Sequence, residues 1–299
     1  MRRLEPDDQA AGLRRLLGEQ NTLRPVGLIG PDAQLNAAAS AGLAHALAAR
    51  GASVGLIDEA PAPHNVAGQH GLTPPLGLAN LAVGSHGFDD SLVNLPDGLR
   101  LLRAELGLAR AAEADDRHWS RLADDFASLG WDWLLLAAPT DERPSLALAA
   151  PRRILVLPAT KSRLTEAYAL LKAAHHRQPD ALWLALFMNA ADDRAEQLMA
   201  ALNQTARRFL GIDIAPLGAV PKDSHLDMAI RSMRPLHRTA PGAPATLAFR
   251  QMAERLNDES TGAGIDARVF WQRLGLFSRL NRPLRTQAPK RQPQGRAYG

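Results

Sequence analysis

Short apolar runs alternate with helix-like stretches along most of this chain, and this alternation limits its fold more than any other feature. The apolar runs predict buried strands, and the Ala- and Leu-rich stretches between them predict helices. This order is typical of an α/β fold with a mostly parallel sheet and helices on both faces. The predicted strands are 26–29, 53–57, 133–138, 154–157, 182–188 and 212–220, and the predicted helices include 35–50, 162–175, 192–210 and 246–256.

The composition excludes several classes of protein. None of the 299 residues is cysteine, so disulfides, thiolate catalysis and cysteine metal sites are excluded, and a reducing cytoplasm is expected. The start of the chain lacks the apolar core of a signal peptide, and no segment is long enough for a transmembrane span. A net charge of +4 is modest, and we predict no nucleic-acid partner.

Segments at both ends fall outside the alternating pattern. We divide the chain into an N-terminal segment (1–23), a nucleotide-binding-like domain (24–257), a linker (258–265), an amphipathic helix (266–282) and a disordered basic tail (283–299). Eight Lys or Arg residues and no acidic residue lie between 267 and 299. Within the domain, the Gly- and Pro-rich stretch 61–87 is predicted to be a long surface excursion.

The turn after the first predicted strand, GPDAQLNAA at 30–38, lies where a nucleotide-binding protein places its phosphate loop. Such a loop needs glycines that let backbone amides converge, a lysine, and a hydroxyl that ligates Mg²⁺. Only Gly30 is present here, and no lysine precedes Lys161. The pair Lys161 and Ser162 follows Pro-Ala-Thr rather than the required glycines.

Four further stretches carry a family resemblance: LIDEAP, WDWLLLAAP, LVLPATKSRLTEAYALLKAAH and LDMAIRSMRPL. In order and spacing, residues 26–256 resemble the MinD/ParA family of deviant Walker ATPases, which implies a P-loop NTPase fold. In that family the site binds ATP and Mg²⁺. The positions of the signature lysine, the phosphate-binding lysine, the Mg²⁺ ligand, the water-handling aspartate and a later aspartate hold Pro31, Asn36, Ala37, Ala60 and Ala137. Only the family's first aspartate remains, as Asp58.

These substitutions predict a degenerate nucleotide site. Each charge-assisted hydrogen bond contributes about 1.5 to 3 kcal/mol, so losing several removes most of the affinity for ATP. Asp32 adds a negative charge at the helix N-terminus, where we expect it to cap the helix. We therefore predict a pseudo-ATPase without catalytic residues, bound cofactor or metal. The alternatives are a Rossmann-like scaffold unrelated to ATPases, a cleft for another ligand, and an active ATPase with an unorthodox loop.

The N-terminal string DQAAGLR, residues 8–14, is the most specific motif in the chain. It matches the D-Q-A-x-x-L-R motif of the FlhG (FleN) family of MinD-like regulators of flagellar number, in which this segment activates the signal-recognition-type GTPase FlhF. The resemblance assigns partner contacts to Asp8, Gln9, Ala10, Leu13 and Arg14, with Gln9 orienting water in the partner's active site. The alternative is a short amphipathic helix packed on its own domain.

The C-terminal helix has a ring-bearing face and a basic face. Large apolar residues opposite arginines favour an interfacial helix, and the FlhG and MinD families carry membrane-targeting helices of this kind. The alternative is a helix docked in a groove of the domain. The predicted membrane-contact residues are Phe270, Trp271, Leu274, Phe277, Arg273 and Arg279.

We predict structural roles for the histidines and for Asn189. The histidines, His64, His70, His175 and His176 among them, are predicted to lie at the surface and to form no metal site. Asn189 matches the family's base-contacting asparagine, but without phosphate contacts we expect it to be structural.

The sequence thus predicts a binding protein that regulates flagellar number or placement. Its expected partners are an FlhF-type GTPase, basal-body proteins or transcriptional regulators, and weakly the cytoplasmic membrane at the cell pole; a scaffold for another polar machine remains an alternative.

Overall fold

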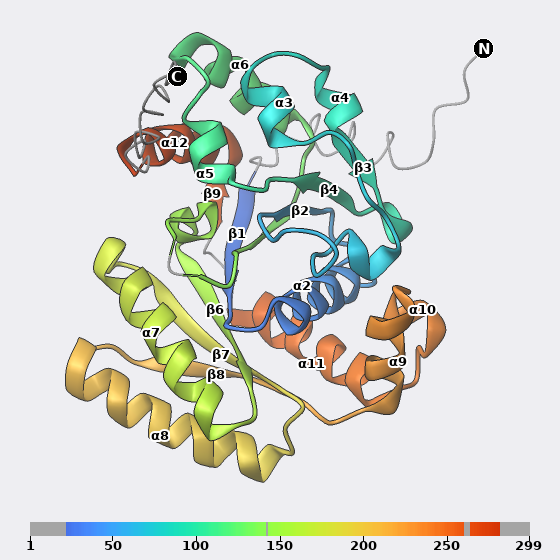
Figure 1. Cartoon of the computed structure of the whole chain (residues 1–299), viewed down its shortest axis with the longest axis vertical. Coiled ribbons are helices and arrows are strands. Elements are labelled where there is room, and N and C mark those ends of the chain that lie inside the picture. The colour runs from blue at the N-terminus through green and yellow to red at the C-terminus, as the bar shows by residue number, and fades with distance from the viewer. Residues whose placement is uncertain (1–21, 142, 260–263, 282–299) are drawn as a thin grey trace, which may run out of the picture.

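The computed structural model describes residues 22–141, 143–259 and 264–281, and the structural statements below concern these residues. Their strands form a nine-stranded sheet in the order β3-β4-β2-β5-β1-β6-β7-β8, with β9 paired to β1 (Figure 1). The strands are β1 (Thr22–Ile29), β2 (Val54–Asp58), β3 (Leu92–Asn94), β4 (Arg100–Arg103), β5 (Trp133–Ala137), β6 (Arg152–Pro158), β7 (Leu182–Met188), β8 (Ile214–Val220) and β9 (Ile265–Asp266).

The sheet is parallel from β4 to β8, as the alternating pattern predicts. Two antiparallel pairings complete it, one between β3 and β4 and one between β1 and β9. The first is a short hairpin that closes through Pro96–Gly98 (η2), where Asp97 and Gly98 have φ of 62° and 73°. Asp-Gly suits a hairpin turn because both residues tolerate the left-handed conformation.

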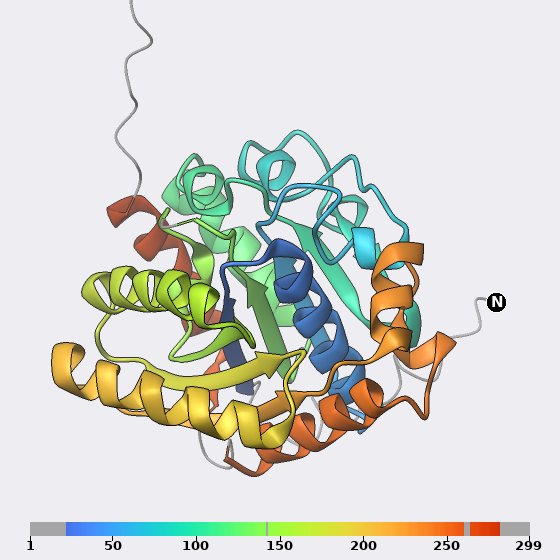
Figure 2. The same cartoon turned by 60° about the horizontal axis from the view of Figure 1, so that its bottom comes forward.

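Helices cover both faces of the sheet (Figures 1 and 2). One face packs against α2 (Ala33–Ala48), α9 (Ser224–Ser232), α10 (Leu236–Thr239) and α11 (Pro244–Glu259). The other packs against α3 (Leu78–Ala82), α5 (Gly107–Ala111), α6 (Asp116–Ser128), α7 (Lys161–Arg177), α8 (Asp192–Leu210), α12 (Ala267–Leu280) and the short turn η3 (Leu146–Ala149). Helix α4 (Phe88–Ser91) precedes β3.

Side chains on the two faces of the sheet belong to two separate hydrophobic cores. In β1, Val26 and Leu28 pack toward α2, whereas Leu23 and Ile29 pack toward the opposite face. This follows from the alternation of side chains along a strand, and apolar residues on both faces are expected for a parallel sheet with two helical layers. The predicted α/β class with a mostly parallel sheet is confirmed.

Helix α12 packs against α5, α6 and η3, far along the chain from all three (Figure 1). Its ring-bearing face points into the domain: Phe270, Trp271, Leu274 and Phe277 are at most 8% exposed. The Trp271 ring stacks on Phe126 with centroids 4.0 Å apart, and the Trp119 indole N–H donates to the Trp271 carbonyl at 2.8 Å. These four apolar residues were expected to touch a membrane, but here they form part of the core. The structure therefore shows the docked alternative.

The basic residues of α12 are partly used in the same docking. Arg279 pairs with Asp116 at 2.8 Å, and Arg268 pairs with Asp124 at 2.5 Å, so two charges that could face anionic lipid face α6 instead. Arg273 is exposed. In the ranges that the structure describes, no helix has both the length and the apolar character needed to cross a membrane.

Candidate functional site

The turn between β1 and α2 has the strand-turn-helix form of a phosphate loop, but its side chains serve the fold. Gly30 is needed for close packing, since a Cβ there would lie 2.7 Å from the Val156 carbonyl oxygen. Asp32 is the N-cap of α2, and its Oδ1 accepts from the Leu35 amide at 3.1 Å. The predicted cap is confirmed, and it places a carboxylate where an anion would bind a helix N-terminus.

Asn36, which the sequence resemblance assigns to the phosphate-binding lysine position, is 2% exposed. Its Nδ2 donates to the Ala138 carbonyl at 3.0 Å and lies 3.4 Å from the Leu28 carbonyl. The amide thus joins the first turn of α2 to the ends of β1 and β5. Ala37, at the position of the Mg²⁺ ligand, is 2% exposed and packs in the core below α2, while Pro31 is half-buried in the turn.

Asp58, the retained aspartate at the end of β2, is 2% exposed. Its Oδ1 accepts from the Ala60 amide at 3.0 Å, and its Oδ2 accepts from the Val66 amide. Burial raises the pKa of Asp58 to about 7, and the two amide bonds act in the opposite direction. The side chain therefore holds the loop after β2 in place.

That loop is more ordered than a surface excursion. Residues 65–69 are buried, contrary to the prediction for this part of 61–87. Besides the bond from Val66 to Asp58, the Asn65 Oδ1 accepts from the Gly68 amide at 2.7 Å. Only glycine fits at position 68, because a Cβ would lie 2.0 Å from the Pro63 carbonyl oxygen. Local polar side chains, which a Gly/Pro count does not weigh, fold the segment back onto α2.

Glu59, next to Asp58, is a second buried carboxyl that the sequence analysis missed. It is 4% exposed, and its Oε1 accepts from the Ser145 hydroxyl at 2.6 Å and from the Leu146 amide at 2.8 Å. Burial raises the pKa of Glu59 to about 8, and the hydrogen bonds from Ser145 and Leu146 oppose that rise. Two buried carboxyl groups, those of Asp58 and Glu59, and the neutral amide of Asn36 thus lie near the carboxyl ends of β2 and β5.

The other predicted site residues are dispersed. Asp8, Gln9, Ala10, Leu13 and Arg14 lie outside the described residues, as do the tail and half of the linker. Thr22 is the first residue that the structure describes. It pairs in the sheet with Asp266, which directly precedes α12. Asn189 follows β7 and is exposed, with a left-handed φ of 57°.

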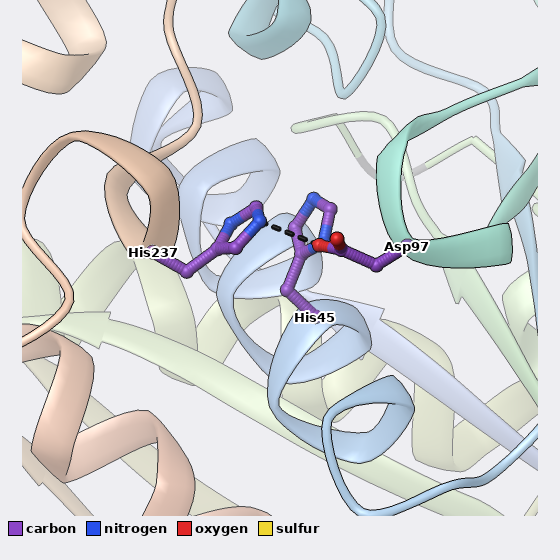
Figure 3. Close-up of side chains that lie close together, drawn as sticks. All are labelled: His45, Asp97 and His237. Atoms are coloured by element: carbon purple, nitrogen blue, oxygen red, sulfur yellow. Dashed lines mark hydrogen bonds and ion pairs between the residues drawn. The ribbon is translucent and has the colours of Figure 1, made fainter.

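Three histidines do not have the surface role predicted for them. His45 of α2, His70 and His237 of α10 meet beside Asp97 of the β3-β4 hairpin (Figure 3 draws His45, His237 and Asp97). His45 is 3% exposed, and burial lowers its pKa to about 3. Burial also lowers the pKa of His70 and of His237. The residues are 25 to 192 positions apart from His45, so no short-range spacing could have indicated the cluster.

The structure resembles several solved proteins. MinD from Aquifex aeolicus superposes with a TM-score of 0.60 at 17% identity, covering 79% of this chain and 98% of that one. MinD from Pyrococcus horikoshii, solved with Mg-ADP, gives a TM-score of 0.61 at 17% identity and covers 80% and 97%. This chain has a MinD-like fold.

Sequence comparison adds a more specific relative. The chain is 28% identical over 225 residues to the antiactivator FleN of Pseudomonas aeruginosa, covering 73% of this chain and 80% of FleN. No family model matches the chain. The MinD-like chain is thus a distant homologue of FleN. In its turn after β1 and the start of α2, the side chains of Asp32 and Asn36 are hydrogen-bonded within the protein.

Proposed function

We propose that this MinD-like protein belongs to the MinD/ParA family and regulates flagellar number or placement by binding partners, without ATPase activity. Two findings support this proposal. The similarity to the antiactivator FleN points to flagellar regulation. The side chains around the turn after β1 are committed to internal bonds rather than left free for a nucleotide.

The observation that best supports the proposed loss of ATPase activity is the position of Asn36. Its amide is buried and donates to the Ala138 carbonyl, so it belongs to the joint between α2 and the sheet. A lysine at this point would bring a positive charge to the phosphates, and an amide brings none. Asp32, as the helix cap, adds a negative charge that opposes a triphosphate at the same helix N-terminus.

For the output of this regulator, we propose that residues 8–14 engage an FlhF-type GTPase. In this proposal Gln9 orients the attacking water, Leu13 is the apolar anchor, and Asp8, Ala10 and Arg14 supply further contacts. The domain surface engages basal-body proteins or a transcriptional regulator.

A GTPase assay tests the proposed partner. The full-length protein should raise GTP hydrolysis by the cognate FlhF-type GTPase, because Gln9 completes the partner's site. The Gln9→Ala variant should lose most of this stimulation, whereas Gln20→Ala, a change of the same kind within the same segment, should keep it. An unchanged hydrolysis rate with the wild-type protein, or equal loss in both variants, would refute the role of Gln9.

A second candidate, an active ATPase with an unorthodox loop, is favoured by one observation. The similar MinD of Pyrococcus horikoshii was solved with Mg-ADP, so the shared fold accommodates a nucleotide in that protein. Direct titration with nucleotide separates the two candidates. A scaffold for another polar machine would keep the fold and lose the response of the GTPase.

We also propose weak contact with the cytoplasmic membrane at the cell pole. The contact would use the exposed face of α12, opposite the buried ring-bearing face. Val269, Leu276 and Leu280 are 37%, 52% and 76% exposed, and with the exposed Arg273 they follow one another at helical spacing. This outer stripe can touch a lipid surface while the helix stays docked. It combines apolar side chains with a basic one, as interfacial helices do.

A further inference from the structure

The cluster of His45, His70, His237 and Asp97 lies outside the proposed nucleotide site and is independent of the proposed function. His45 lies nine residues along α2 from Asn36, which is roughly 13 Å along the helix axis. The four side chains come from α2, the loop after β2, the β3-β4 hairpin and α10, so the cluster joins segments that are distant in sequence. Figure 3 shows His45 and His237 converging on Asp97.

Hydrogen-bond chemistry fixes the proton positions from one end of the cluster. The Val66 carbonyl can only accept, so the His70 Nδ1, 2.8 Å away, must carry the proton. In a neutral His70 the Nε2 is then an acceptor, and it faces the Nε2 of His45 at 2.8 Å. The proton of His45 must therefore lie on Nε2, which leaves Nδ1 with a bare lone pair.

That lone pair points at another acceptor. The Nδ1 of His45 lies 3.0 Å from the Oδ2 of Asp97, so a nitrogen lone pair and a carboxylate oxygen face each other. The Nε2 of His237 lies 2.6 Å from the same oxygen, is shielded from solvent and makes no aligned hydrogen bond. The His237 ring stacks on His45 with centroids 3.7 Å apart. With the proton of His237 on Nδ1, three electron-pair donors converge on one point, and a cation there would remove their repulsion.

We propose that His45, Asp97 and His237 bind a Zn²⁺ ion. Their donor atoms all lie within 4.8 Å of one another. Two imidazole nitrogens and one carboxylate oxygen suit zinc, whereas Mg²⁺ and Ca²⁺ prefer oxygen ligands. His70 is the outer partner that accepts from the Nε2–H of His45 and holds its Nδ1 toward the metal.

The surroundings of the cluster suit a metal site. In a tetrahedral zinc site the ligand atoms stand about 3.4 Å apart, so the pairs at 3.0 and 2.6 Å must open slightly. The Asp97 side chain is 41% exposed and can move outward. All three ligands line a pocket of about 260 Å³, which gives the ion a path from solvent and a place for a fourth ligand such as water.

A bound ion would brace a defined part of the fold. It would tie α10 and the β3-β4 hairpin to the middle of α2. Through His70 it would also reach Val66, whose amide donates to Asp58. The zinc site would thereby stabilise the same loop that Asp58 holds.

Calorimetric titration of the untagged full-length protein with Zn²⁺, after removal of metals with a chelator, tests the site. We expect one ion per chain, no heat with Mg²⁺, and visible absorption bands of a tetrahedral complex when Co²⁺ is used instead. Asp97→Asn and His237→Gln should each weaken Zn²⁺ binding at least tenfold. Asn suits the left-handed φ of 62° at position 97, so the hairpin should fold unchanged in the first variant.

His176→Gln is the matched control, since His176 is exposed on α7 outside the cluster, and it should bind Zn²⁺ like the wild type. Circular dichroism shows whether each variant folds, and if His237→Gln does not fold, Asp97→Asn alone decides. The proposal is overturned if the wild-type protein does not bind Zn²⁺, which would mean that an extra proton bridges the cluster. It is equally overturned if Asp97→Asn binds Zn²⁺ as tightly as the wild type.

Discussion

Among single residues, Asn36 shows how a buried amide can join a helix to the sheet. The sequence indicates only that the family's lysine is missing. The structure shows that the amide which replaces it spans from α2 to the Ala138 carbonyl at the end of β5. Its amide nitrogen donates to a backbone carbonyl, whereas its buried Oδ1 has no hydrogen-bond partner among the described residues.

We expect Asn36→Ala to lower the free energy of unfolding by about 1 to 2 kcal/mol, because the buried Ala138 carbonyl loses this donor. Gln34→Ala, an exposed change in the same helical turn, should alter it by less than about 0.5 kcal/mol. Urea denaturation measures both. Equal stability of the two variants would show that the amide does not hold the joint together.

Glu59 predicts how stability depends on pH. Its folded-state pKa of about 8 lies above the ordinary value of 4.5, so between these pH values the folded protein keeps a proton that the unfolded chain has released. The stabilisation from this group is present in full below pH 4.5 and is lost as the pH rises through about 8. Asp58, with a pKa raised to about 7, acts in the same direction.

Glu59→Gln should therefore flatten the fall in melting temperature between pH 5 and about pH 8, while Asp58 keeps part of it. The substitution preserves the acceptor atom, because Ser145 and Leu146 both donate to one oxygen of Glu59. Thermal unfolding followed at several pH values measures the slope. If wild type and variant lose stability in parallel, Glu59 is ionised in the folded protein.

A helix cap can be predicted from the sequence, whereas a cluster of side chains from distant segments cannot. Asp32 was predicted as a cap because a cap depends on three neighbouring residues. The histidine cluster was missed because His45, Asp97 and His237 belong to elements that only the folded sheet brings together.

At the scale of elements, strong periodicity predicted well and short elements did not. The strand Leu182–Met188 and the helix Asp192–Leu210 have the predicted bounds. The strands β3 and β4 were missed, since three or four residues are too few to show a pattern. For α12 the helix itself was expected, but the side that it buries depends on α6, whose Trp119 and Phe126 form the matching surface.

The docked position of α12 changes which substitutions test membrane binding. Substituting the buried Phe270 would disturb the core, so its effect on lipid binding would be ambiguous. Leu280→Glu should instead reduce flotation with anionic lipid vesicles, because Leu280 is 76% exposed at the end of the outer stripe.

Leu182→Glu is the control for this experiment, since Leu182 is 65% exposed at the start of β7, away from α12. It should float as the wild type does. Absence of wild-type flotation, or equal reduction in both variants, would argue against membrane contact through this stripe.

Across the whole molecule, the sheet and its helices have the MinD-like arrangement. The fold class could be predicted because alternation of strands and helices is a property of the entire chain. The use of the site could not, because it depends on whether each polar group is bonded within the protein or left open to a ligand. Asp32, Asn36 and Asp58 are all bonded internally.

Calorimetric titration of the full-length protein with MgATP and with MgADP tests whether the domain still binds a nucleotide. The MinD of Pyrococcus horikoshii, which was solved with Mg-ADP, serves as the positive control. We predict no saturable heat from this protein with either nucleotide, because the turn after β1 contains no lysine and Asp32 at the helix N-terminus would repel the phosphates. Saturable binding in the micromolar range, accompanied by release of phosphate from ATP, would show that the protein is an active ATPase.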